Sequence, residues 1–179
     1  MQTERLTPKP EAVDKPLAQL EQVLAGLLAE NEQLLSLLKH KRVALGSADY
    51  KQVTDCCRRE NEQVQAISEL EKRRLSLVGE LTQLVDPAAA EPLRMVELAE
   101  RLGEPARGRL LVQRVQLQER MEQARRETGV VQRATESLFK HMQGLIQSIG
   151  AVCTGVGTYG QTGSPPRAAL SVSTFNTTA

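Results

Sequence analysis

The chain has few aromatic residues and no Trp. Aromatic residues make up 2% of its 179 positions, and they are Tyr50, Phe139, Tyr159 and Phe175. Active sites and small-molecule pockets usually combine aromatic side chains with a few convergent polar groups. No serine, cysteine or carboxylate stands in a recognisable catalytic setting either. We therefore expect a protein that is not an enzyme and that uses no cofactor.

Cysteine and histidine are also scarce. Cys56 and Cys57 are adjacent, so on a helix they point about 100° apart and cannot readily form a disulfide. Cys153 is isolated, and no C-x-x-C pair occurs. His40 and His141 are far apart and lack metal-ligand spacing with any cysteine. The sequence thus predicts free thiols and no metal site.

Strong charge and long apolar runs are missing. The net charge of +1 argues against a nucleic-acid binder that relies on overall electrostatics. No apolar run approaches the roughly 18 residues that span a bilayer. Residues 1–16 are polar and interrupted by prolines, without the apolar core of a signal peptide. The expected location is the cytoplasm, with no insertion into a membrane.

Proline is absent from two long stretches, between Pro16 and Pro87 and between Pro105 and Pro165. Both are long enough to form the main helices. In the first, leucines recur at alternating steps of three and four residues, which places one apolar stripe along a helix. This stripe consists of Leu17, Leu20, Leu24, Leu27, Leu34, Leu38 and Leu45, with polar slots at Asn31 and Lys41. Asn31 either fixes the helix register from the seam or lies at a solvated edge.

A break at Gly46–Asp49 divides this stretch. Gly46 can end one helix, Ser47 can cap the next, and Asp49 favours its positive end. We expect a helix from Asp14 to about Leu45 and a second from near Asp49, paired as an antiparallel hairpin. The second apolar stripe is Val53, Cys56, Ile67, Leu70, Leu77, Leu81 and Leu84, widened by Val64, Val78 and Val85 and weakened by Glu60, Gln63 and Arg74.

Two further helices are expected after the loop at 86–92. A short helix spans 92–102, with Leu93, Val96 and Leu102 facing inward and Gly103 as its stop. Glu104-Pro105 then opens the longest helix, which either runs straight or bends near Gly129. Its stripe is Leu110, Leu117, Met121, Ala124, Thr128, Val131, Thr135, Leu138, Met142, Leu145 and Ile149. The bulky end of this stripe either completes the core or forms an exposed apolar face for a partner helix.

Composition changes abruptly after Gly150. Glycine, proline, serine and threonine dominate, with one Arg and no acidic residue. Such a segment cannot bury enough surface to order itself. We expect an all-α helical bundle over 14–150, a flexible N-terminus over 1–13 and a disordered tail over 151–179. The tail contains Tyr159-Gly160-Gln161-Thr162-Gly163, a lone aromatic residue of the kind used in short docking motifs.

The order of these parts resembles the FlgN family of flagellar export chaperones. The matching segments are Leu34–Arg42 with Ala44-Leu45, then Glu97–Leu102 with Pro105 and the long helix, and finally Leu138–Ile149 followed by Tyr-Gly-x-x-Gly at 159–163. The last feature is the most specific. The resemblance covers Asp14 to Gly163 and leaves 172–179 without an assignment.

The resemblance implies a role in type III protein export during flagellum biogenesis. Members of that family are cytoplasmic chaperones that bind the C-terminal helical ends of hook–filament junction proteins (hook-associated proteins) and then dock on the membrane export gate. By resemblance, the junction-protein contact maps to Leu138, Met142, Leu145 and Ile149, and the gate-docking tyrosine maps to Tyr159. A structural coiled-coil scaffold that self-associates, for instance as a homodimer, is the alternative.

Overall fold

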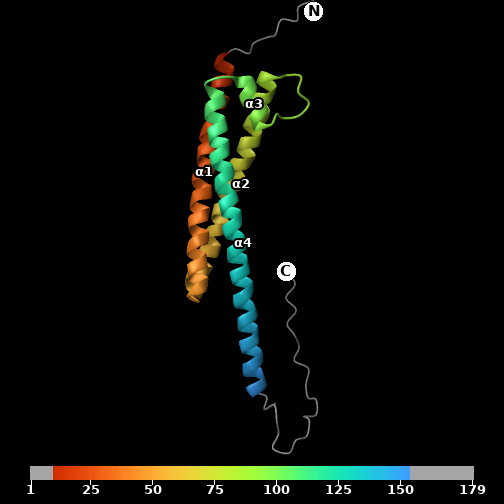
Figure 1. Ribbon diagram of the computed structural model, residues 1–179. Helices are drawn as coiled ribbons and strands as arrows, with labels where there is room; N and C mark the ends of the chain where they lie inside the picture. The colour runs from red at the N-terminus through yellow and green to blue at the C-terminus, as the bar shows by residue number, and fades with distance from the viewer. Residues whose placement is uncertain (1–9, 154–179) are drawn as a thin grey trace, which may run out of the picture. The chain divides into compact units, whose positions relative to one another are not determined.

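The computed structural model describes residues 10–153, which form four helices and, within that range, no strand. The helices are α1 (Pro10–Gly46), α2 (Tyr50–Val85), α3 (Met95–Leu102) and α4 (Ala106–Cys153), as Figure 1 shows. The predicted all-α class, with a long hairpin, a short helix and a long last helix, is confirmed. The chain divides into two units, one up to Thr135 and one from Glu136 onward. The predicted tail beyond residue 153 lies outside the described residues.

α1 and α2 form the predicted antiparallel hairpin (Figure 1). Lys41, near the end of α1, contacts Glu60 in the first part of α2. Farther back along α1, Glu30 accepts a hydrogen bond from Gln63. A Cβ added to Gly26 would lie 3.5 Å from a methyl group of Leu70, so the two helices approach closely there. Contacts move backward along α1 as they move forward along α2, which is the register of an antiparallel pair.

The connection between α1 and α2 differs in one respect from the prediction. Gly46 ends α1 as expected, but the hydroxyl group of Ser47 donates to the carbonyl groups of Val43 and Ala44, both at 3.2 Å. That hydroxyl group therefore satisfies backbone carbonyl groups at the end of α1 and does not cap the start of α2. Asp49 caps α2 instead, since its carboxylate accepts the backbone N–H of Gln52 at 3.1 Å. The predicted cap at Ser47 is wrong, whereas the predicted start near Asp49 is confirmed.

α1 begins at Pro10, so the predicted start at Asp14 is one turn too late. Pro10 suits a first helical position because its fixed φ is already helical and its missing N–H would be unpaired there. Pro16 lies inside the helix, where its ring removes one backbone hydrogen bond. Its side chain is buried together with Leu17, and this burial offsets part of that loss.

All four helices contribute to one hydrophobic core in the first unit. The fully buried leucines are Leu20, Leu27, Leu38, Leu81, Leu98 and Leu110. The predicted stripe of α1 is buried apart from Leu34, which is half-buried. Asn31 is only 5% exposed, so it occupies the seam and not a solvated edge. Its amide group donates to the carbonyl of Leu27 at 2.8 Å, within its own helix.

The weak centre of the α2 stripe is occupied by paired polar side chains. Lys41 Nζ lies 2.6 Å from a carboxylate oxygen of Glu60, and Gln63 donates to both the backbone and the carboxylate of Glu30. These half-buried side chains cross between the hairpin helices at positions where a leucine seam would place apolar groups. Val64 is 51% exposed, so its predicted place in the stripe is wrong.

α3 starts at Met95 and not at Pro92. The backbone N–H of Leu93 donates to the hydroxyl oxygen of Thr82 at 3.0 Å. This hydrogen bond holds the residues just before Met95 outside the helix. Gly103, with φ of 70°, ends α3 as predicted. The predicted inward face was incomplete: Leu98 and Ala99 are fully buried, whereas Leu93, Val96 and Leu102 are half-buried.

The first part of α4 packs on the hairpin. Leu110, Leu117, Ala124 and Val131 are buried, but three other members of the predicted stripe are exposed: Met121 (44%), Thr128 and Thr135. Three ion pairs connect this part to α1: Arg109–Glu21 at 2.8 Å, Arg120–Glu32 at 3.1 Å and Arg42–Glu127 at 3.0 Å. The assigned helix runs without interruption through Gly129, so no break occurs at that position.

Candidate partner-binding face

The part of α4 that belongs to the second unit exposes large apolar side chains. Leu145 is 50% exposed, Ile149 62% and Phe139 61%; Ile146 and Met142 are also exposed, and Leu138 is half-buried. Of the two interpretations of this end of the stripe, the structure agrees with the exposed apolar face. We call the set Leu138, Met142, Leu145 and Ile149 the C-terminal face.

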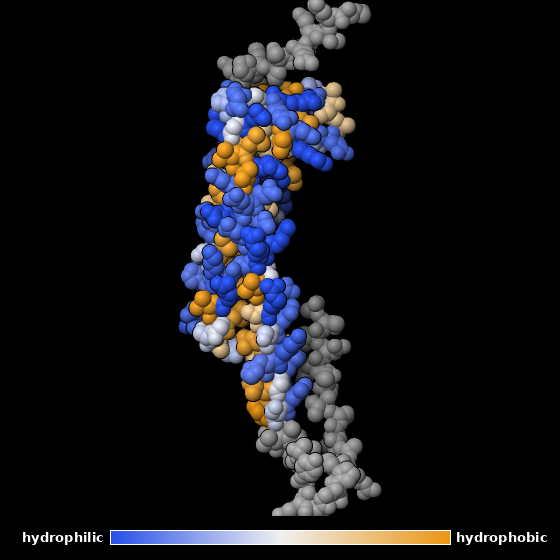
Figure 2. Space-filling view, in the orientation of Figure 1, coloured by the Kyte–Doolittle hydropathy of each residue, from blue (hydrophilic) through white to orange (hydrophobic). Residues whose placement is uncertain are grey.

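Helix geometry explains why these four side chains share a face. Their spacing of four, three and four residues brings them to nearly the same angle around an axis with 3.6 residues per turn. At about 1.5 Å per residue, the face is roughly 16 Å long. Phe139 and Ile146 flank it. In Figure 2 this end of α4 carries hydrophobic side chains along one edge and hydrophilic ones along the other.

The charges of this segment lie away from the C-terminal face. Between Glu136 and Gly150 the only ionisable side chains are Glu136, Lys140 and His141. At 100° per residue, Glu136 and Lys140 point to the side opposite Leu138, whereas His141 lies about 60° from Leu138, at the edge of the face. An apolar partner could therefore cover the face without removing the charges of Glu136 and Lys140 from water, which is the expensive part of burying polar groups.

The structure brings together four of the five predicted site residues. Leu138, Met142, Leu145 and Ile149 share one helical face, as their spacing indicates. Tyr159 lies outside the described residues, so its predicted docking role stays a prediction. The exposed side chains that flank the face, Phe139 and Ile146, also follow from the sequence, since both adjoin the stripe.

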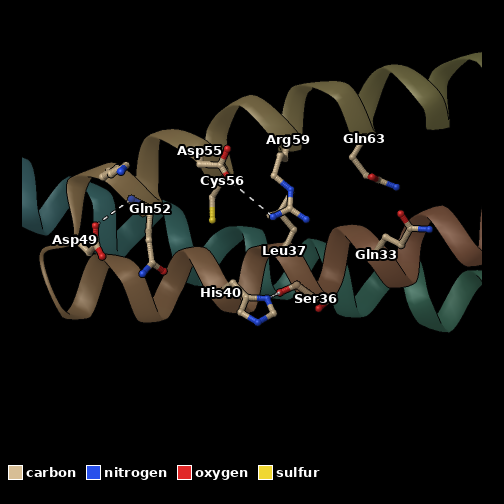
Figure 3. Close-up of a pocket in the computed structure, with 11 residues that line it drawn as sticks. Gln33, Ser36, Leu37, His40, Asp49, Gln52, Asp55, Cys56, Arg59 and Gln63 are labelled. Carbon is tan, nitrogen blue, oxygen red and sulfur yellow. Dashed lines mark hydrogen bonds and ion pairs between the residues drawn. The ribbon is translucent and has the colours of Figure 1, made fainter.

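A cleft between α1 and α2 had no counterpart among the predicted sites (Figure 3). It has a volume of about 740 Å³ and is lined mainly by polar residues: Gln33, Ser36, Leu37, His40, Asp49, Lys51, Gln52, Asp55, Cys56, Arg59 and Gln63. Several of them have partners within their own helix: His40 forms a hydrogen bond with the Ser36 carbonyl at 2.9 Å, and Arg59 forms an ion pair with Asp55 at 3.7 Å. The signal in the sequence was the polar interruption of both stripes, at Asn31 and Lys41 in α1 and at Glu60 and Gln63 in α2.

The chemistry of this cleft does not favour reactivity. Cys56 points into it, and burial raises the pKa of the Cys56 thiol, so the thiol stays protonated and weakly nucleophilic. Among residues 10–153, no group of three or more His, Cys, Asp or Glu side chains is arranged to hold a metal ion. We therefore assign no site to the cleft.

No helix in the described part of the chain is long and apolar enough to cross a membrane. Comparison with curated proteins gives no match, and neither does comparison with solved structures. A family model described as FlgN protein matches residues 17–167, which is most of the chain and includes α1 from Leu17 onward and all of α2, α3 and α4. The protein therefore belongs to the FlgN family of flagellar export chaperones.

Proposed function

We propose that this protein acts in the cytoplasm, where it binds the C-terminal helical ends of hook–filament junction proteins on its C-terminal face. It then delivers them to the flagellar export gate. Membership of the FlgN family supports the chaperone role. The observation that carries the binding proposal is the exposure of Leu145 and Ile149 together with Phe139 and Ile146 on one short segment of α4.

The physical basis is the matching of two amphipathic helices. Helical ends that will later assemble into a filament junction expose apolar faces, which aggregate when they are left uncovered. A helix with its own exposed apolar face can cover such an end as in a coiled coil. A client segment that orders only on binding gives up part of the interaction energy, which keeps the complex releasable.

The test is to replace Leu145 with Asp and measure binding of a junction-protein C-terminal peptide. Burying one large aliphatic side chain contributes roughly 1.5–3 kcal/mol, so we expect affinity to fall by at least about tenfold. Helical circular dichroism should persist, because Leu145 is half exposed and lies outside the core. The matched control is Val112→Asp, which places the same charge at a 56%-exposed position in the first part of α4.

Two results would contradict the proposal. Unchanged peptide binding by Leu145→Asp would place the contact elsewhere, and equal loss in Val112→Asp would show a general charge effect. Sedimentation equilibrium tests the alternative function. If the free protein is a stable dimer that Leu145→Asp converts to a monomer, the face serves self-association and the protein is a scaffold.

A further inference from the structure

A second concave surface lies on the first unit, far along the chain from the C-terminal face. We call it the α2–α4 groove. It has a volume of about 670 Å³ and is lined by residues of all four helices: Leu24, Glu71, Arg74, Met95, Arg114, Leu117, Gln118, Met121, Glu122, Arg125 and Arg126. None of these side chains is aromatic, and the family assignment gives the groove no role.

The groove carries an excess of positive charge. Residues 106–135 of α4 contain seven Arg and only three Glu, although the whole chain has a net charge of +1. Most of these arginines form ion pairs, for instance Arg126 with Glu122 at 3.0 Å. Among the described residues, however, Arg114 and Arg125 have no acidic partner, and both are exposed at the groove. The groove therefore presents two guanidinium groups that are available to an outside carboxylate.

Apolar side chains lie between these two arginines. Met121 is 44% exposed, although its neighbours along the stripe, Leu117 and Ala124, are buried. Leu24 and Leu117, which also line the groove, are buried, and Met95 of α3 is half-buried. Methionine adapts its shape to different apolar partners. The groove thus combines an adaptable apolar floor with a positive rim.

We propose that the α2–α4 groove binds an amphipathic helix of a partner protein that carries two acidic side chains about three turns apart. Arg114 and Arg125 are separated by eleven residues of one helix, which corresponds to roughly 16 Å. A partner helix lying along α4 would meet both arginines with carboxylates at the same spacing. Apolar side chains between these carboxylates would rest on Met121 and Met95.

The charges of residues 1–9 and 154–179 argue against either end of this chain as the occupant of the groove. Residues 154–179 contain no acidic residue, and residues 1–9 contain only Glu4 beside Arg5 and Lys9. The absence of aromatic lining removes the stacking platform that single-stranded nucleic acid uses. A concave apolar floor also suits a helix better than a flat membrane surface.

The four methionines allow the site to be tested directly. We would label the methionine methyl groups of the full chain and add a helical peptide of about 16 residues with leucines on one face and two glutamates eleven residues apart. We expect the methyl NMR signals of Met95 and Met121 to shift, while that of Met142, which reports on the C-terminal face, stays in place. A junction-protein peptide should do the reverse, so the two proposals can fail separately.

Variants then identify the contact. Arg125→Glu should weaken the glutamate peptide by about tenfold at low salt, because an attraction becomes a repulsion. Arg133→Glu is the matched control: it makes the same charge change on an exposed α4 arginine that does not line the groove, and it should change affinity by less than about twofold. A peptide with lysines in place of the glutamates should bind the Arg114→Glu/Arg125→Glu double variant better than the unaltered protein.

Three results would overturn the proposal. One is equal affinity for the glutamate peptide and a glutamine version of it. Another is a shift of Met142 with no shift of Met95 or Met121. The third is a response of the groove methionines to duplex DNA or to phosphatidylserine vesicles but not to the peptide, which would make the surface a generic anion binder.

Discussion

Buried polar side chains show how individual residues make the bundle specific. Thr82 is fully buried, yet its hydroxyl group donates to the Val78 carbonyl at 2.7 Å and accepts the N–H of Leu93 at 3.0 Å. Asn31 is satisfied by the carbonyl of Leu27. Such groups cost little when paired and much when left alone in an apolar setting. Single substitutions at these positions should therefore have clear effects.

Replacing Thr82 with Val should destabilise the protein by about 1–3 kcal/mol, because the backbone N–H of Leu93 would lose its acceptor. The volume of the side chain hardly changes, so the loss reports on the hydrogen bond and not on packing. Urea unfolding followed by circular dichroism measures it. Thr54→Val is the control, since Thr54 is exposed and bonds only to the Tyr50 carbonyl. Equal effects at both positions would contradict the assignment.

Lys41 should give the stability a pH dependence. Burial favours the neutral amine, but the hydrogen bond and charge of Glu60, with smaller contributions from Cys57, together outweigh it and raise the pKa of Lys41 above its ordinary value of 10.5. A raised pKa in the folded state means that the contribution of the pair is complete below pH 10.5 and is lost as the pH rises through the folded-state pKa. The destabilisation caused by Lys41→Met should thus be constant near neutral pH and shrink above pH 10.5.

The control for this measurement is Lys72→Met. Lys72 pairs with Glu69 at 2.7 Å, but both side chains are largely exposed, so the pair should contribute little at any pH. A destabilisation by Lys41→Met that grows above pH 10.5 would contradict the expected linkage.

At the scale of single elements, α4 has two differently buried parts. Leu110, Leu117 and Val131 lie in the first unit and are buried, whereas the large apolar residues from Phe139 to Ile149 are mostly exposed. One helix thus contributes both to the core and to an exposed apolar face. The same residue type should accordingly have different energetic weight in its two parts.

Leu110→Ala should destabilise the protein by about 2–5 kcal/mol, because it leaves a cavity where the side chain is fully buried. Ile146→Ala should change stability by less than about 0.5 kcal/mol, since Ile146 is 67% exposed. Chemical denaturation of both variants measures the difference. A large loss in Ile146→Ala would mean that the end of α4 is packed in the free protein, which would argue against its availability to a client.

At the scale of the whole molecule, the proposed function assigns different partners to different segments. The C-terminal face would hold the client, and Tyr159 would contact the export gate. Tyr159 follows Ile149, the last residue of the C-terminal face, by ten residues, so one chain can make both contacts. If the assignments are right, the two interactions should be separable by mutation.

Tyr159→Ala should leave affinity for a junction-protein peptide within about threefold, which is under about 1 kcal/mol. The same variant should weaken binding of the loaded complex to the cytoplasmic domain of the export gate and reduce motility. A tyrosine offers a large apolar contact and a hydroxyl group at low entropic cost, so its loss should be measurable. Titration calorimetry with each partner tests this. Loss of client binding, or gate binding that is indifferent to the change, would refute the separation.

The sequence by itself determined the class of the fold and the location of its helices. Leucine spacing from Leu17 to Leu45 and the absence of proline between Pro16 and Pro87 are local signals, because helix formation depends on neighbours three and four residues away. Helical spacing likewise predicts which residues of α4 share the C-terminal face, and the glycine at position 103 predicts the stop of α3.

Only the tertiary structure decided which of these positions are exposed to solvent. Met121 continues the stripe of α4 but is exposed, whereas Leu98 and Ala99 are fully buried although the predicted inward face of α3 omitted them. In the sequence, the polar residues Glu60 and Gln63 only interrupt the apolar stripe of α2. The fold shows that Lys41 and Glu30 lie opposite them as partners. Burial depends on contacts between segments far apart in the chain, and helical periodicity carries no information about which neighbour covers a face. For the same reason, the sequence alone does not decide whether the C-terminal face completes the core or is exposed.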